Sequence, residues 1–305
     1  MTTAARQFAV ILLAFLCLGV SCSDRDGPSS PAAAGGADTG RLQAVQIIGS
    51  DTMVNLVQAW AEAFGPLHPE ALISIRGGGS GTGLAALLNK SCDLAMSSRP
   101  ISRKEINEAE ANGIHPREWR VGLDGLIVIV NPHNTVDSVD LDQLRDIFLA
   151  RVRDWSELGG TGGKIVILSR ESSSGTYMFF KEHVLRRGSN KNKDEFSPEA
   201  LLMPSSQAIV NEVAQNPHAV GYVGLGYLSP RLKALAVAKT PEAPAVAPSI
   251  KTVADNSYPI SRPLFFYTDG EAAGAVRGFI DFALSPAGQK IVVETDFVPV
   301  GEVQE

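Results

Sequence analysis

Apolar and polar residues alternate along this chain in short blocks that predict an α/β fold. Some blocks are continuous apolar runs typical of buried strands, and others repeat apolar residues at helical spacing. Strands are expected at 45–48, 72–75, 93–96, 125–130, 165–168, 219–224 and 262–267. Helices are expected from 51 or 52, from 84, and over 141–148, 177–185, 276–284 and 287–294. Alternation of strands with helices is typical of the α/β class.

Two long buried strands bracket the centre of the chain. The run Pro263 to Tyr267 is expected to pair with the run Ile127 to Val130. This arrangement predicts two lobes joined by two crossing strands. Residues 42–125 and 262–305 would form lobe 1, and residues 126–261 would form lobe 2. Hinges are then expected within 123–132 and 258–266.

The N-terminal residues predict export. Arg6 precedes the apolar run Phe8 to Leu18, and small residues lead to Cys22, so residues 1–21 have the layout of a lipoprotein signal peptide. Cys22 would be acylated, which predicts a lipid-anchored protein of the periplasm or cell surface. An ordinary signal peptide cut near Ser21 is the alternative. Residues 22–41 are rich in Ser, Gly, Ala and Pro and predict a flexible tether.

The remaining composition excludes several classes of function. The net charge is −6, with no basic stripe, which argues against a nucleic-acid partner and against capture of anions by bulk attraction. Cys92 is the one cysteine beyond the signal and Cys22, so no intramolecular disulfide is expected in the mature chain. The histidines lack metal-ligand spacing. Neither a metal, a cofactor nor a catalytic residue is therefore expected.

Four loops share an unusual composition of glycine and small hydroxyl residues. They are Gly49–Met53, Gly77–Gly83, Ser97–Pro100 and Arg170–Thr176. Three precede a predicted helix, whose free N–H groups bind oxyanions. Ser and Thr add neutral donors, glycine lets the backbone approach a ligand, and arginine matches two oxygens of a tetrahedral oxyanion. Together the loops predict a site for a small, desolvated oxyanion.

Other interpretations of single loops are weaker. Any one loop is explained by helix capping or a turn alone. The glycine-rich segment Gly77 to Gly83 is not a P-loop, because no Gly-Lys-Ser/Thr follows, and it lacks the spacing of a dinucleotide fingerprint. A nucleophile elbow fails at its last position, where Thr82 replaces glycine.

At these loops the sequence resembles the phosphate-binding proteins of phosphate ABC transporters, which have the periplasmic-binding-protein fold of type II. The supporting phrases, in order, are GSDTM, GGGSGTG, DLAMSSRP, GLIVIVNP, RESSSGTY, AVGYVGLGYL and SPAGQKIVVETDFVPV. The resemblance implies two α/β lobes that close over a buried phosphate without performing chemistry. It also implies delivery to the permease subunits of an ABC transporter, and we expect a monomer.

The resemblance assigns roles residue by residue. Its implied ligand contacts are Thr52, the Met53 N–H, Ser80, Ser98, Arg170, Ser174, Gly175 and Thr176. Some family members have an aspartate at the position of Ser98, which accepts the phosphate proton and so rejects sulfate. Asp51 is the nearest substitute acceptor, or else it caps a helix. Arg99 either contacts the anion or pairs with an acidic neighbour.

Three alternatives to a phosphate receptor follow from these residues. The Ser98 departure leaves sulfate, molybdate, arsenate or phosphite as the oxyanion. A secreted hydrolase that uses Ser80 or Ser174 is a different class of function, although no histidine or acid motif supports it. A sensor or adhesin that binds phosphate without a permease is the third.

Overall fold

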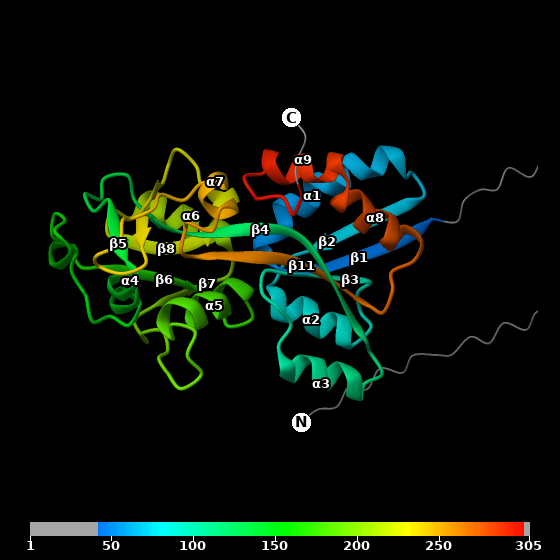
Figure 1. Ribbon diagram of the computed structural model, residues 1–305, viewed down its shortest axis with the longest axis horizontal. Helices are drawn as coiled ribbons and strands as arrows, with labels where there is room; N and C mark the ends of the chain where they lie inside the picture. The colour runs from blue at the N-terminus through cyan, green and yellow to red at the C-terminus, as the bar shows by residue number, and fades with distance from the viewer. Residues whose placement is uncertain (1–41, 302–305) are drawn as a thin grey trace, which may run out of the picture. The chain divides into compact units, whose positions relative to one another are not determined.

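The computed structural model describes residues 42–301 (Figure 1). The predicted signal peptide, the lipidation site Cys22 and the tether lie outside the described residues. Within residues 42–301, none of the helices combines the length and the apolar character that crossing a membrane requires.

The strands form a mixed sheet of nine strands. Its order is β2-β1-β3-β11-β4-β8-β6-β7, and β9 pairs with β4, while β5 and β10 form a separate pair. Strands β1, β2 and β3 are parallel, as are β6, β7 and β8, and β11 is antiparallel to β3 and β4. The bounds are β1 Gln43–Gly49, β2 Ala71–Arg76, β3 Leu94–Ser97, β4 Pro116–Val130, β5 Ser138–Asp140, β6 Val166–Arg170, β7 Leu201–Met203, β8 Ala219–Gly224, β9 Lys233–Ala234, β10 Ala236–Ala238 and β11 Ser261–Asp269.

The helices follow the predicted periodicity where their apolar face is strong. Helix α1 buries Leu56, Val57, Trp60 and Phe64, and a 3-10 turn, Asp51–Met53, leads into it. Capping boxes begin α3 at Ser102 and α4 at Asp140. The bounds are α1 Val54–Phe64, α2 Ser80–Leu88, α3 Arg103–Ala111, α4 Leu141–Phe148, α5 Gly175–Phe180, α6 Ser206–Gln215, α7 Ile250–Ala254, α8 Gly274–Leu284 and α9 Pro286–Glu294.

The buried apolar residues fall into two groups. One group joins β1–β3, α1, α2, α8 and α9, and we call this part of the chain the terminal half. The other group joins α4, α6, β6 and β8 with their neighbours, and we call this part the middle half. On β4, Val121 belongs to the core of the terminal half and Leu126 to the core of the middle half. At β11, Leu264 belongs to the core of the terminal half, and Ile260, just before the strand, belongs to the core of the middle half. Strands β4 and β11 therefore run through both halves (Figure 1).

A third segment also connects the halves. The chain after α9 returns to β4, where Leu123 N donates to Val298 O at 2.7 Å. Phe297 lies in the core of the terminal half, whereas Val298 lies in the core of the middle half. Two crossing strands were expected, and this segment adds to them.

The predicted pairing of the two long strands is wrong in its register. Strand β11 pairs with β4, but Pro263 lies opposite Leu123 and Tyr267 lies opposite Glu118. The run Ile127 to Val130 pairs with β8 instead. The error arises because β4 begins at Pro116, and its first five residues are exposed or half-buried and include three charges. The apolar run marks only the buried second part of a longer strand.

Candidate functional site

The four glycine- and hydroxyl-rich loops follow strand ends that face the same place. Thr52 follows β1, Ser80 opens α2 after β2, Ser98 follows β3, and Arg170 ends β6 ahead of α5. In α/β sheets, ligands bind outside the carboxyl ends of the strands, because loops and helix starts converge there. Loops from the terminal half thus meet loops from the middle half.

Two threonine hydroxyls touch across the halves. Thr52 Oγ1 and Thr176 Oγ1 are 2.8 Å apart, and both residues are buried. Gly224 makes room for this approach, since a Cβ there would lie 2.9 Å from Thr52 Cγ2 and from Asp124 Oδ1. The contact joins residues 124 positions apart in the chain.

A second contact across the halves is made by Gly175 of the middle half with two serines of the terminal half. Ser80 Oγ accepts the Ser98 N–H at 3.0 Å and lies 3.4 Å from Ser98 Oγ. Gly175 packs against both, because a Cβ at this position would lie 2.2 Å from Ser80 Oγ and 2.8 Å from Ser98 Oγ. Gly81 N also donates to Ser173 O at 2.9 Å. Buried hydroxyls of the terminal half therefore pack against the start of α5 in the middle half.

Arg170 reaches the same region from β6. Its guanidinium is buried and lies 3.1 Å from the Asp51 carboxylate, through Nη1 and Oδ2. Nη1 also donates to Ser206 Oγ at 2.9 Å, and Nη2 donates to Pro204 O at 3.2 Å. Nε has no hydrogen-bond partner among the described residues. A buried N–H without a partner is costly, so this donor points to a ligand.

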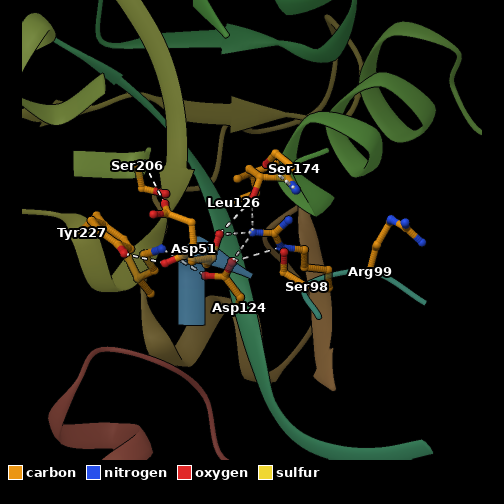
Figure 2. Close-up of polar contacts among 12 residues, drawn as sticks. Asp51, Ser98, Arg99, Asp124, Leu126, Ser174, Ser206 and Tyr227 are labelled. Carbon is orange, nitrogen blue, oxygen red and sulfur yellow. Dashed lines mark hydrogen bonds and ion pairs between the residues drawn. The ribbon is translucent and has the colours of Figure 1, made fainter. Parts of the chain in front are cut away.

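Asp51 connects the two halves. Its Oδ2 accepts the Ser206 N–H at 2.7 Å, at the start of α6, and its backbone oxygen accepts the Tyr227 hydroxyl at 2.9 Å. Figure 2 shows Asp51 between Ser206 and Tyr227. The carboxylate therefore meets α6 in the middle half rather than its own turn. Burial raises the pKa of Tyr227, with the Asp51 charge next in importance, so this hydroxyl stays a donor.

An ion pair that was not predicted lies beside the threonines. Arg262 on β11 and Asp124 on β4 are both fully buried, with Nη2 and Oδ2 2.8 Å apart. Arg262 Nη2 also donates to Thr176 Oγ1 at 3.0 Å and to Thr52 Oγ1 at 3.4 Å. Burial raises the pKa of Asp124 and lowers that of Arg262, and the attraction between the two opposes both shifts.

The charges at the site balance. Arg170 and Arg262 carry two positive charges, and Asp51 and Asp124 carry two negative charges. An anion is then held by directed donors rather than by excess charge, in agreement with the acidic composition. Among residues 42–301, no cluster of three or more histidine, cysteine or acidic side chains is placed to hold a metal ion.

Two predicted contacts have other partners in the structure. The Met53 N–H donates to Ser50 O at 3.1 Å within the 3-10 turn, and its side chain lies in the core, so this N–H is not a free donor. Ser174 Oγ caps α5 by accepting from Thr176 N and Tyr177 N. Capping thus explains the position of Ser174, although its hydroxyl proton is still able to donate.

Arg99 has an acidic partner in the structure. Its two terminal nitrogens donate to the Glu105 carboxylate at 2.7 and 2.8 Å, and these side chains fix the start of α3. Figure 2 shows Arg99 pointing away from the other labelled side chains. Of the two predicted roles, pairing with an acidic neighbour is the one in the structure. The helix-capping alternative for Asp51 is wrong for its own turn, where Ser50 is the N-cap residue and, among the described residues, makes no side-chain capping bond.

Comparison with known proteins decides the family. A model described as the PBP superfamily domain matches residues 29–287. Proteins named phosphate-binding protein PstS are similar to the chain. The one from Pseudomonas aeruginosa is 31% identical over 83% of this chain and 82% of its own length. The one from Bacillus subtilis is 30% identical over 97% of this chain and 94% of its own length. This chain belongs to the phosphate-binding protein family of the PBP superfamily.

Solved structures of the family agree with the fold. A putative phosphate ABC transporter substrate-binding protein from Clostridium perfringens, with bound phosphate, is 29% identical and matches with a TM-score of 0.76 over 85% of this chain and 100% of its own. An ABC-type phosphate transport receptor from Vibrio cholerae is 26% identical, with a TM-score of 0.66 over 83% of this chain and 99% of its own. The predicted α/β fold and family resemblance are confirmed. Because the family consists of binding proteins, the prediction that the chain is not an enzyme is confirmed as well.

Proposed function

We propose that this chain binds inorganic phosphate outside the cytoplasmic membrane and delivers it to the permease of an ABC transporter. One observation carries the proposal: neutral donors from both halves meet beside a buried arginine. These donors are the hydroxyls of Thr52, Thr176, Ser80 and Ser98. Phosphate is small and multiply charged, and such directed donors replace its hydration shell. The relatives' names and the phosphate in the Clostridium perfringens structure support the same ligand.

The two halves serve as the two lobes of a receptor. The cores change over near residues 125 and 261, which supports lobe 1 as 42–125 with 262–305 and lobe 2 as 126–261. The contacts between Thr52 and Thr176 and between Asp51 and Ser206 form only when the lobes are closed. Rotation about β4 and β11 admits and releases the anion by hinge motion.

The proposed ligand contacts follow from this geometry. They are Thr52, Ser80, Ser98, Arg170, Gly175 and Thr176, with Ser174 as a further donor. Arg99 and the Met53 N–H are left out, because both terminal nitrogens of Arg99 pair with Glu105 and the Met53 N–H donates to Ser50. The Ser80 and Ser174 hydroxyls contact Ser98 and backbone amides, which gives the hydrolase alternative no support.

Attachment and assembly complete the proposal. Cys22 would carry the lipid that holds the receptor, as a monomer, at the periplasmic or outer cell surface. The apolar run before Cys22 supports this assignment. Mass spectrometry of the membrane-bound chain tests it. An acyl group on Cys22 is expected, and an unmodified N-terminal residue, whether Cys22 or a neighbour, would contradict the lipoprotein assignment.

Calorimetry with a panel of oxyanions tests the ligand. The purified chain, freed of bound phosphate, is titrated with phosphate, sulfate, molybdate, arsenate and phosphite. We expect micromolar or tighter binding of phosphate. A much weaker response to sulfate would show that a buried acceptor detects the phosphate proton, since a buried group left unpaired costs a few kcal/mol. Stronger binding of another oxyanion would replace phosphate as the ligand. No heat with any of them would sink the proposal.

Substitution of Asp51 distinguishes two possible roles of its carboxylate: holding the lobes closed and accepting the phosphate proton. If Asp51 holds the lobes closed through Arg170 and Ser206, Asp51→Asn is expected to weaken phosphate and sulfate by the same factor, about 10- to 100-fold, because hydrogen bonds to charged groups contribute about 1.5–3 kcal/mol. If Asp51 accepts the phosphate proton, only phosphate weakens and sulfate binding improves. The structure favours the first result, since Oδ2 is already 2.7 Å from Ser206 N. Asp281→Asn, in an exposed ion pair with Arg277, is the control.

A further inference from the structure

Arg262 and Asp124 occupy the crossing between the halves. They lie directly opposite each other in the pairing of β11 with β4, and neither side chain is exposed. The pair lies where the two core groups change over, next to the hydroxyl contact described above. Charged side chains are almost never fully buried unless they are paired, so a pair at this place calls for an explanation.

The contacts of Arg262 extend beyond its ion pair. Nε donates to Asp124 Oδ2 at 3.0 Å, and Nη2 is shared between Asp124 and the hydroxyls of Thr52 and Thr176. Nη1 has no hydrogen-bond partner among the described residues. The guanidinium also lies over the Phe179 ring, 5.6 Å from its centroid. A pair that served only to join β4 and β11 would need neither the contacts to the threonines nor an unpartnered Nη1.

The donation to the threonines has a chemical consequence. A hydroxyl carries one proton and two lone pairs, so it can donate one hydrogen bond and accept others at the same time. Arg262 supplies a donor to both Oγ1 atoms, which occupies lone pairs and leaves the hydroxyl protons to be directed elsewhere. One proton joins the two threonines at 2.8 Å. A hydroxyl polarised by a charged donor is in turn a better donor to an anion.

Asp124 stabilises the buried guanidinium of Arg262 in the ligand-free protein. An isolated buried guanidinium would be strongly unfavourable, and the carboxylate beside it neutralises the charge. Its other oxygen, Oδ1, accepts the Leu225 N–H at 3.1 Å, which fixes the carboxylate in place. Burial chiefly lowers the pKa of Arg262, and the charge of Arg170, the other buried arginine of the site, lowers it further.

We infer that Arg262 is a positioning residue of the oxyanion site, which holds the hydrogen-bonded pair of Thr52 and Thr176 hydroxyls so that the remaining hydroxyl proton donates to the ligand. Asp124 is the counter-ion that keeps the guanidinium buried before the anion arrives. This inference rests on the proposed function. It adds a second arginine, from the crossing strand, to the donors that the loops supply.

The first test measures phosphate binding by calorimetry. Arg262→Gln is expected to weaken phosphate about 30- to 100-fold, since a charged donor is roughly twice as strong as a neutral one and both threonine hydroxyls lose their orientation. Arg262→Lys keeps the charge without the fork of donors and is expected to recover part of that loss. Arg277→Gln, on the exposed face of α8, is the matched control with no expected change.

The second test distinguishes positioning from stability alone. In Asp124→Asn the guanidinium loses its counter-ion, so the ligand-free protein is expected to melt earlier while phosphate still binds. The rise in Tm caused by a saturating phosphate concentration is then expected to be larger than in the unchanged chain, because the anion supplies the missing charge. A pair with only a structural role would lower Tm equally with and without phosphate.

A double-mutant cycle completes the design. Loss of binding in Arg262→Gln and in Thr52→Val is expected to be less than additive when the changes are combined, because both remove one donor system. If Arg262→Gln binds phosphate within twofold of the unchanged chain, or if the two losses simply add, the inference is overturned and the proposed function stands. If the unchanged chain binds no oxyanion, the proposed function fails and the inference falls with it. Should Arg262→Gln not fold, Arg262→Lys and Asp124→Asn decide the question.

Discussion

Replacement of Arg170 by alanine is expected to abolish phosphate binding at ordinary ligand concentrations, with a loss of roughly 100- to 1,000-fold in affinity. Truncating one partner of a buried, hydrogen-bonded charge pair costs about 2–5 kcal/mol, and 1.4 kcal/mol corresponds to a factor of ten. Arg170 is nearly fully buried and supports Asp51 and Ser206, so its removal also leaves the Asp51 carboxylate without a counter-charge. Both effects act on the closed form.

Calorimetry with phosphate measures this loss, and thermal unfolding shows whether the variant is folded. Arg151→Ala is the control, because Arg151 is about half exposed and its salt bridge to Asp146 lies at the surface. The control is expected to bind like the unchanged chain. If Arg170→Ala is folded and binds phosphate within a few-fold of the unchanged chain, the site proposed here is misplaced.

Replacement of Gly175 by alanine is expected to cost about 100-fold in affinity while leaving each half folded. The added methyl would lie 2.2 Å from Ser80 Oγ and 2.8 Å from Ser98 Oγ, which belong to the opposite half. Overpacking of this kind costs about 1–3 kcal/mol or more. Gly175 begins α5 without a positive φ, so alanine itself suits the local backbone. The penalty therefore falls on the closed form alone.

Two measurements separate this effect from unfolding. The variant is expected to keep its melting transition without phosphate and to lose most of the stabilisation that phosphate provides to the unchanged chain. Gly65→Ala is the matched control, since no atom lies within 4 Å of the added methyl. Equal phosphate affinity in Gly175→Ala and Gly65→Ala would show that the halves do not close on Gly175.

Much of the local structure was predictable, because hydrophobic periodicity reports which face of an element is buried. The strands after which the four loops follow were found in this way, and so was the amphipathic helix α1. Helix α3 was missed, since of its residues only Ala109 is buried and its periodicity is therefore weak. Helix α6 was also missed, although its start at Ser206 receives Asp51.

The unpredicted pair of Asp124 and Arg262 left a signal in the sequence. Each is a lone charge beside an apolar run that was expected to be buried, and such a charge needs a partner. The assumed register, with 263–267 against 127–130, did not bring the two together. In the observed register, Arg262 lies directly opposite Asp124, and the register of β11 against β4 shifts between Leu264 and Phe265. Register depends on pairing along the whole strand, which a short apolar run does not report.

By itself, the sequence determined the α/β class, the family and the kind of chemistry at the site, because loop composition and periodicity are local properties. It left open what Asp51 and Arg99 do, and it assigned a donor role to the Met53 N–H. Only the tertiary structure showed which partners these groups have, since each side chain takes the partner that folding brings nearest. Asp51 meets Ser206, 155 positions along the chain, whereas Arg99 meets Glu105 only six positions away. The residues next to a polar side chain in the sequence do not indicate which partner it will bind in the folded protein.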